Sequence, residues 1–68
     1  MKYQCYYNET LYVESNEGLP VPVVGAKVIV EDAVFDTETE AEQYCETHYG
    51  VQQIGDEFID NEMRYEEV

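Results

Sequence analysis

A helix start signal in the middle of the chain limits the fold more than any other pattern. The segment from Thr37 to Glu40 (TETE) matches the capping box, in which the first and last side chains satisfy each other's backbone amides. Residues at the spacing i, i+3, i+4 and i+7 then form one apolar stripe: Ala41, Tyr44, Cys45 and His48. Gly50 stands where a left-handed C-terminal cap is expected. The pattern predicts a helix over about residues 37–49.

The segments before this helix have the composition of β-strands. Residues 2–7 and 10–15 are rich in Tyr, Val, Leu and Thr, and Asn8-Glu9 between them suits a tight turn. Residues 15–22 are expected to form a loop, because two prolines in this segment lack backbone donors. Residues 26–30 (AKVIV) carry the strongest strand signal, which Val34-Phe35 either extends or follows as a separate strand.

The segments after the helix are also strand-like. Val51 to Ile54 predicts a short strand, and Gly55-Asp56 suits a two-residue hairpin turn into Glu57-Phe58-Ile59. We expect a further strand over Glu62 to Tyr65. The pattern therefore predicts an α+β fold, a small antiparallel sheet of about four to five strands with one helix packed on one face. Residues 1–68 are expected to form a single acidic domain.

The charge of the chain excludes several classes of partner. Sixteen of the 68 residues are Asp or Glu and three are Lys or Arg, a formal net charge of −13. Direct binding of DNA or RNA needs Lys and Arg to displace counterions, and attachment to anionic lipid needs a basic cluster. We therefore expect neither partner. Without a signal peptide or a long apolar run, a cytoplasmic location is expected, in the host cytoplasm if a phage encodes the chain.

The negative charge is concentrated in the second part of the sequence. The first thirty residues hold three acids against two lysines, whereas the remaining thirty-eight hold thirteen acids against a single arginine. On the predicted helix Glu38, Glu42 and Glu46 follow one another at i, i+4, where surface helices commonly place a lysine. Like charges at this spacing repel, so the pattern does not optimise the folded monomer. It is typical of a surface made for a partner or for high salt.

The leading hypothesis is a non-enzymatic binding or inhibitor protein that presents a negative, nucleic-acid-mimicking surface. Its partner would be a basic protein that normally holds nucleic acid, by analogy with the small acidic anti-restriction and anti-CRISPR inhibitors of phages and mobile elements. The expected interaction residues are nine acids: Glu31, Asp32, Glu38, Glu42, Glu46, Asp56, Glu57, Asp60 and Glu62. The helical stripe alone repeats every ~6 Å. DNA carries a charge every ~3.4 Å per strand, so the other acids must form neighbouring rows.

The alternative is a small accessory or regulatory interaction domain that uses its tyrosine-rich first strands. Its expected interaction residues are Tyr3, Tyr6, Tyr7 and Tyr12. Residues 2–7 as an edge strand would also pair with a second chain and give a homodimer. The competing interpretation is that these rings only cover a thin sheet. A third interpretation takes the charge as solubility or salt adaptation, which would spread the acids more evenly.

The sequence gives little support for catalysis or a metal. Cys45 and His48 lie one helical turn apart, as in an activated nucleophile or half of a zinc site, but only Cys5 remains as a third ligand. The acidic run from Asp56 to Glu62 lacks the calcium-loop spacing. We therefore expect no enzyme activity, no catalytic residue, no metal and no cofactor. Both cysteines are expected to be free thiols.

Overall fold

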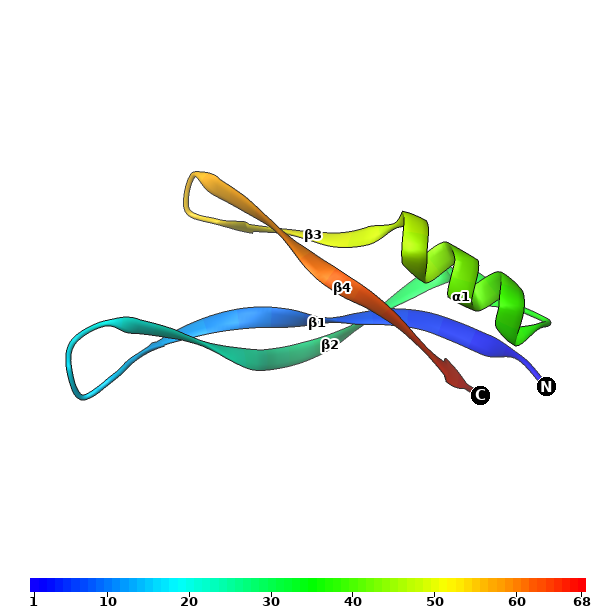
Figure 1. The fold of residues 1–68 in the computed structure, drawn as a ribbon, viewed down its shortest axis with the longest axis horizontal. Coiled ribbons are helices and arrows are strands. Elements are labelled where there is room, and N and C mark those ends of the chain that lie inside the picture. The colour runs from blue at the N-terminus through cyan, green and yellow to red at the C-terminus, as the bar shows by residue number, and fades with distance from the viewer.

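The computed structural model describes all 68 residues as a four-stranded sheet with one helix against it. The elements in chain order are β1 (Tyr3–Glu14), β2 (Pro20–Phe35), α1 (Glu38–Thr47), β3 (Tyr49–Ile54) and β4 (Glu57–Glu67). The strand order is β2-β1-β4-β3, and every neighbouring pair is antiparallel. The helix contacts β1, β2 and β4 (Figure 1). The predicted α+β class and its single helix are confirmed.

The helix begins where the capping signal predicts. The Thr37 hydroxyl accepts a hydrogen bond from the Glu40 backbone N–H at 3.3 Å and donates to the Glu40 carboxylate at 3.1 Å. The predicted C-terminal cap is wrong. Extended backbone at His48 ends the helix, and its N–H donates to the carbonyl of Tyr44. Gly50 lies instead within β3. A glycine is needed there because the Tyr7 ring occupies the space that a side chain would fill.

The first half of the chain is one long hairpin, so two sequence predictions are wrong. Asn8 pairs with Lys27 across the sheet, and this pairing carries β1 straight through the expected turn at residues 8–9. The expected loop over residues 15–22 shrinks to residues 15–19, because Pro20 and Pro22 open β2. Prolines are tolerated there because β2 is an edge strand, where a nitrogen that faces outward donates to no neighbour.

The second half follows the sequence more closely. The hairpin turn at Gly55-Asp56 is confirmed, and Gly55 takes the left-handed φ of 63° that this tight turn requires. The expected strands at 57–59 and 62–65 are confirmed as two parts of the single strand β4. Along its other edge, β4 pairs with β1 only from Tyr3 to Tyr7. Residues 2–7 are therefore an interior strand, and their prediction as an edge strand is wrong.

The two hairpins separate beyond this short central pairing, at a point that we call the fork (Figure 1). The Gln52 side chain spans the gap there, accepting from the Thr10 backbone N–H at 2.9 Å and donating to the Thr10 carbonyl at 2.8 Å. Asn61, which is buried, accepts from the Thr10 hydroxyl and donates to the Gln52 side chain and the Gly50 carbonyl. These side-chain amides replace the strand pairing that ends at Tyr7.

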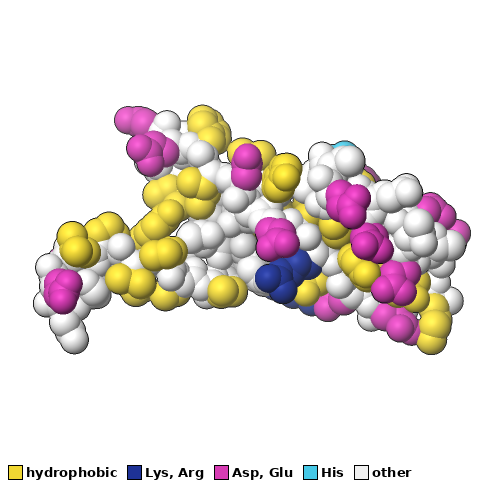
Figure 2. Space-filling model, in the orientation of Figure 1, with side chains coloured by type: hydrophobic (Ala, Val, Ile, Leu, Met, Phe, Trp, Pro, Cys, Tyr) yellow, Lys and Arg dark blue, Asp and Glu magenta, His cyan; other side chains and the backbone are white.

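The core is small and lies at one end of the molecule, between α1 and the sheet. It consists of four buried side chains: Cys5, Ala33, Ala41 and Met63. The molecule measures 46 × 21 × 17 Å, and its radius of gyration of 14.3 Å exceeds the value of about 11 Å expected for a chain of this length. Its accessible surface is 5086 Å², against about 4,400 Å² for a typical monomer of this mass. The chain therefore leaves an unusually large surface uncovered (Figure 2).

Candidate functional site

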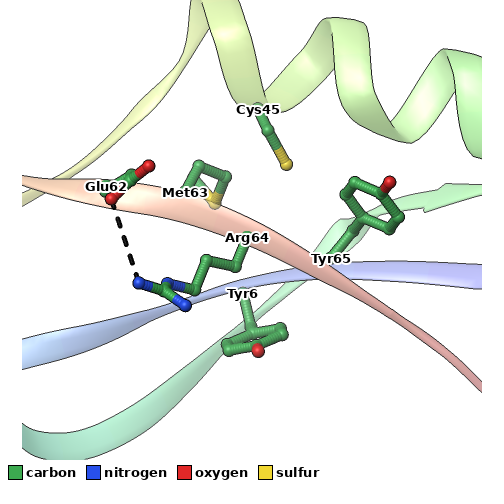
Figure 3. A pocket seen from close by; sticks show the side chains of 6 residues that line it. All are labelled: Tyr6, Cys45, Glu62, Met63, Arg64 and Tyr65. Atoms are coloured by element: carbon green, nitrogen blue, oxygen red, sulfur yellow. Dashed lines mark ion pairs between the residues drawn. The ribbon is translucent and has the colours of Figure 1, made fainter.

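A surface recess of about 350 Å³ adjoins β4 near the core. Its lining residues are Tyr6, Cys45, Glu62, Met63, Arg64 and Tyr65. Figure 3 shows Cys45 and Met63 on one side of β4, with Arg64 and Tyr6 on the other side. Successive residues of a strand point to opposite faces, so these side chains do not converge on one point. The recess gives no geometry for a nucleophile with its base.

The thiol and imidazole singled out in the sequence have different partners. The Cys45 thiol neighbours the Cys5 thiol, which donates to the Ala41 carbonyl at 3.9 Å, whereas the His48 ring stacks on Tyr44 with 3.9 Å between ring centroids. Both cysteines are free. Burial raises the pKa of Cys5, and burial with the neighbouring Cys5 raises the pKa of Cys45 to about 11. Because the thiolate is the reactive form, these thiols are poorly suited to nucleophilic chemistry at neutral pH.

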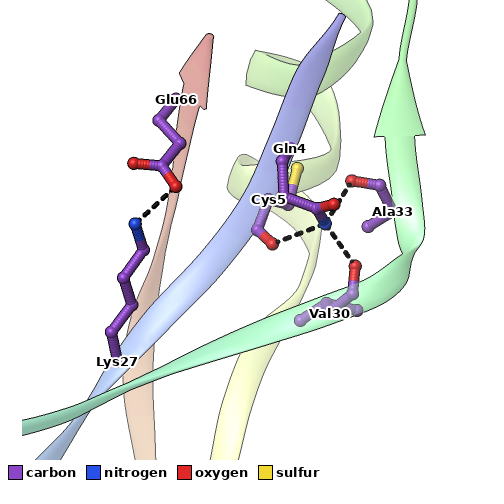
Figure 4. Close-up of polar contacts among 6 residues, drawn as sticks. All are labelled: Gln4, Cys5, Lys27, Val30, Ala33 and Glu66. Atoms are coloured by element: carbon purple, nitrogen blue, oxygen red, sulfur yellow. Dashed lines mark hydrogen bonds and ion pairs between the residues drawn. The ribbon is translucent and has the colours of Figure 1, made fainter. Parts of the chain in front are cut away.

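The three basic side chains are all paired with acids. Lys2 lies 2.6 Å from Asp36, Arg64 lies 4.0 Å from Glu62, and Lys27 pairs with Glu66 (Figure 4). Hydrogen bonding and the opposite charge raise the pKa of Lys2 and lower that of Asp36. None of the three cations lies on α1, so the helix keeps its full negative charge.

The predicted glutamate stripe lies on the exposed surface of α1. Glu38, Glu42 and Glu46 are all exposed, and the last turn holds no basic residue. The Tyr65 hydroxyl donates to the Glu38 carboxylate at 2.9 Å. This hydrogen bond, followed by desolvation and the charges of Glu38 and Glu42, raises the pKa of Tyr65 to about 12. The raised pKa of Tyr65 therefore reflects mainly its hydrogen bond to Glu38, with smaller contributions from the neighbouring charges.

Two further predicted acids, Glu31 and Asp32, lie in a bulge of β2 next to the helix end. One residue of β1, Cys5, spans four residues of β2 here, from Val30 to Ala33. The Gln4 side chain holds the bulge by donating to the carbonyls of Val30 at 2.6 Å and Ala33 at 3.3 Å (Figure 4). Ala33 thereby enters the core beside Ala41. The exposed acids of the bulge thus adjoin the helix-bearing end.

The other four predicted acids lie elsewhere, so the nine do not form one continuous surface. Asp60 and Glu62 alternate with the buried Met63 and lie on the sheet face opposite the helix. Asp56 and Glu57 lie at the β3–β4 turn, about 20 Å from the start of β3 at 3.3 Å per residue. Figure 2 shows acidic side chains over the helix and also at this distant turn, with apolar side chains between them. We use the term acidic end for Glu31, Asp32, Glu38, Glu42 and Glu46.

The four tyrosines of the alternative hypothesis do not form one patch. Tyr3 and Tyr7 pack against the core, Tyr3 edge-on to Tyr65 and Tyr7 over Gly50. Tyr6 lies on the opposite face, 4.5 Å below the Lys27 ammonium. Only Tyr12 lies well exposed, on the distant part of the first hairpin. Tyr3 and Tyr7 therefore cover a thin sheet, as in the competing interpretation.

The sequence prediction missed a set of exposed apolar side chains. The part of the β1–β2 hairpin beyond the fork, residues 11–24, is called the arm. Leu11 faces Val23 and Val13 faces Val21 across the hairpin, and these four form the arm patch, each 38–48% exposed. The run PVPVV begins at Pro20, and only its first three residues fall within the segment 15–22 that the prolines predict to be a loop. Its missing apolar–polar alternation was the available signal for a strand with apolar side chains on both faces.

Comparisons with known proteins do not identify a family for this chain. The single helix is too short and too polar to cross a membrane. No group of three or more acidic, cysteine or histidine side chains has the geometry of a metal site. Protein-family models, curated proteins and solved structures were compared with the chain, and no significant match was found.

Proposed function

We propose that this chain is a non-enzymatic binding protein whose acidic end docks on a basic protein that normally holds nucleic acid. The observation that carries the proposal is the exposed glutamate stripe of α1, which has no cation within the helix while all three basic side chains are paired elsewhere. Glutamates in these positions repel one another and are costly to the monomer. A basic partner would turn that repulsion into attraction.

The geometry narrows the surface that such a partner would contact. The acidic end combines the helical stripe with Glu31 and Asp32 of the β2 bulge, whereas Asp56, Glu57 and Asp60 lie outside it. A partner that follows the helix would meet a charge every ~6 Å. This spacing is about twice that of phosphates along one DNA strand, so we propose occupation of a phosphate-binding groove without a close copy of the duplex. Electrostatic steering would make association fast and sensitive to salt.

The test is competition with DNA. A panel of basic DNA-binding proteins, each loaded with a fluorescent duplex, is titrated with the native chain at about 0.1 M salt, and direct binding of the chain to a responsive partner is then measured without DNA at about 0.1 M and about 1 M salt. We expect displacement of the duplex at low salt, and direct binding that is lost at high salt. The triple variant Glu38→Gln, Glu42→Gln and Glu46→Gln is expected to compete about tenfold less well.

A matched triple variant controls for net charge. Asp56→Asn, Glu57→Gln and Asp60→Asn removes the same number of charges outside the acidic end, and we expect it to change competition by less than about threefold. Equal losses in both triple variants would show that net charge acts without a defined surface. Direct binding of the chain that does not depend on salt would contradict the proposal.

A second candidate function, a protein-interaction domain, is favoured by the exposed arm rather than by the tyrosines as a group. The arm patch and the neighbouring Tyr12 and Val24 are exposed at the end of the molecule opposite the core. Apolar patches of this kind are typical of protein–protein interaction sites.

A further inference from the structure

The whole molecule exposes more surface than a typical monomer of its mass, by an amount close to one side of a stable dimer interface. The accessible surface exceeds that of a typical monomer of this mass by about 700 Å², and a standard interface buries ≈ 800 Å² on each partner. The arm contributes four aliphatic side chains on one face. Val24, the next residue after Val23, is 80% exposed and lies outside that face. Exposed apolar side chains such as these stabilise the molecule only when they are covered.

The two edges of the arm differ in what they offer to another strand. Ser15 donates its N–H to the carbonyl of Leu19 at 3.0 Å, which fixes the alternation of hydrogen-bonded pairs along the hairpin. Residues paired as Glu14 with Pro20 and as Tyr12 with Pro22 then direct their backbone groups outward. The contact of Thr10, at the next such position, with Gln52 agrees with this alternation.

The outer edge of β2 is therefore blocked, whereas that of β1 is open. Pro20 and Pro22 have no N–H to present, and prolines at such positions protect an edge from pairing. Tyr12 and Glu14 present free N–H and carbonyl groups on the side of the arm that faces the fork. Only an incoming strand that enters the fork can use them.

The opposite side of the fork is apolar as well. Ile54 lies two residues after Gln52 and shares its face of β3, so it points toward the arm as the Gln52 amide does. Ile59 pairs with Gln52 across the hairpin and lies on the same face. Figure 2 shows apolar side chains on both hairpins where they diverge.

The distribution of charge identifies the occupant that suits this site. The arm carries two acids, Glu14 and Glu17, and no base, so it offers no charge complementarity to a basic partner. The acidic end lies at the other end of a molecule 46 Å long. Two copies can therefore meet through their arms while their acidic ends stay apart. Only a self-complementary apolar surface is needed, as in a twofold dimer.

We propose that two copies of this chain form a twofold dimer in which the arm of each lies in the fork of the other. The open edges of β1 pair antiparallel near Tyr12 and Glu14, and the arm patch of one copy packs against its partner's apolar surface. This dimer is independent of the acidic end. It would give the assembly two acidic ends, one at each extremity.

Sedimentation of the full chain across a salt series tests the dimer. We expect a species of twice 7.9 kDa whose dissociation constant falls as salt rises, because salt screens the repulsion between two copies of charge −13. Binding of a basic partner has the opposite salt dependence, so the two proposals fail separately. The triple glutamine variant of α1 is expected to dimerise at least as well as the native chain.

Two pairs of variants test the contacts. Val13→Lys on the arm patch is expected to weaken the dimer about tenfold or more, although it lowers the repulsive charge. Val51→Lys, on the β3 face away from the fork, adds the same charge and serves as its control. Glu14→Pro blocks the open edge without removing a hydrogen bond within the hairpin, whereas Glu14→Gln removes only the charge.

The expected order of dimer affinity is Glu14→Gln above Glu14→Pro, and Val51→Lys above Val13→Lys. Far-ultraviolet circular dichroism of each variant verifies that the monomer remains folded, and if Val13→Lys unfolds it is replaced by Val21→Lys on the same patch. A native chain that stays monomeric at every salt concentration would overturn the proposal. Equal weakening by Val13→Lys and Val51→Lys would also overturn it.

Discussion

The two ends of this molecule differ in how they are stabilised and in what they expose. The helix-bearing end holds all four buried apolar side chains and most of the charge, whereas the arm holds many exposed apolar side chains and two acids. The first end is stabilised by its own core. The arm is stabilised within one chain mainly by the backbone hydrogen bonds of a single hairpin, and isolated hairpins are marginal in water. Apolar content alone therefore does not locate the stable part of a small protein.

The largest expected effect comes from the core. Met63→Ala leaves a cavity between the sheet and α1, and such truncations cost about 2–5 kcal/mol of unfolding free energy. A chain of this size rarely has more than about 3–5 kcal/mol in total, so the variant is expected to be largely unfolded. Val21→Ala, on the arm, is expected to cost less than about 1 kcal/mol in dilute monomer. Urea unfolding measures both losses of unfolding free energy. Similar losses would show that the arm contributes as much to the stability of the monomer as the core does.

The fork is the next most sensitive region, because it joins the two hairpins through side chains. Gln52→Glu removes the Nε2 donor and places a carboxylate against the carbonyl of Thr10, with an expected cost of about 1–3 kcal/mol. Gln53→Glu adds the same charge next to it, but its amide bonds only to Gly55 in the exposed turn. Hydrogen exchange at the Thr10 amide is expected to speed up in the first variant alone. Equal exchange in both would mean that the amide pair does not hold the fork.

These contrasts show why the sequence located some elements and missed others. The capping signal at Thr37 and the turn at Gly55 act within a few residues, so a local pattern contains the information. The continuity of β1 depends on Asn8 pairing with Lys27, and the fork depends on Gln52 meeting Thr10, 42 positions apart. Long-range pairing overrode the local turn preference in the first case.

The candidate sites follow the same division. The stripe Glu38, Glu42 and Glu46 was predictable because helical periodicity alone puts these residues on one side. Whether Asp56 and Glu57 join them depends on the direction of β3, and no local pattern gives that direction. The arm patch was missed because proline was weighed as a loop former. Its tolerance in an edge strand depends on the strand order, which the sequence does not display.

A smaller effect at the core end is a loss of stability at alkaline pH. The folded state holds the proton of Cys45 up to a pKa of about 11, whereas the unfolded thiol releases it near 9.0. The unfolded state therefore binds fewer protons between these values, so the unfolding free energy is full below pH 9 and falls as pH rises toward 11. Tyr65, whose pKa is raised to about 12, extends the decline.

Urea midpoints measured from about pH 8 to about pH 11 follow this decline. Cys45→Ala is expected to flatten its lower part, and Tyr65→Phe its upper part. A midpoint that is constant or rises over this interval would contradict the burial of the thiol. Neither cysteine lies in the arm.

The smallest expected effect on stability separates folding from binding at the acidic end. Glu46→Lys places a cation in the last turn of α1, four residues after Glu42, where it interacts favourably with both Glu42 and the helix dipole. We expect the unfolding free energy to rise by about 0.5 kcal/mol. The same substitution interrupts the glutamate stripe and is expected to weaken competition with DNA.

Glu17→Lys in the arm turn makes the same change of charge far from the helix and serves as the control. It is expected to leave DNA competition nearly unchanged. If the stripe is maintained for a partner, Glu46→Lys both stabilises the chain and weakens its binding to that partner. If Glu46→Lys stabilises the chain and competes undiminished, the glutamate at this position has no role in binding. The charge of the acidic end would then be explained by solubility or salt adaptation instead.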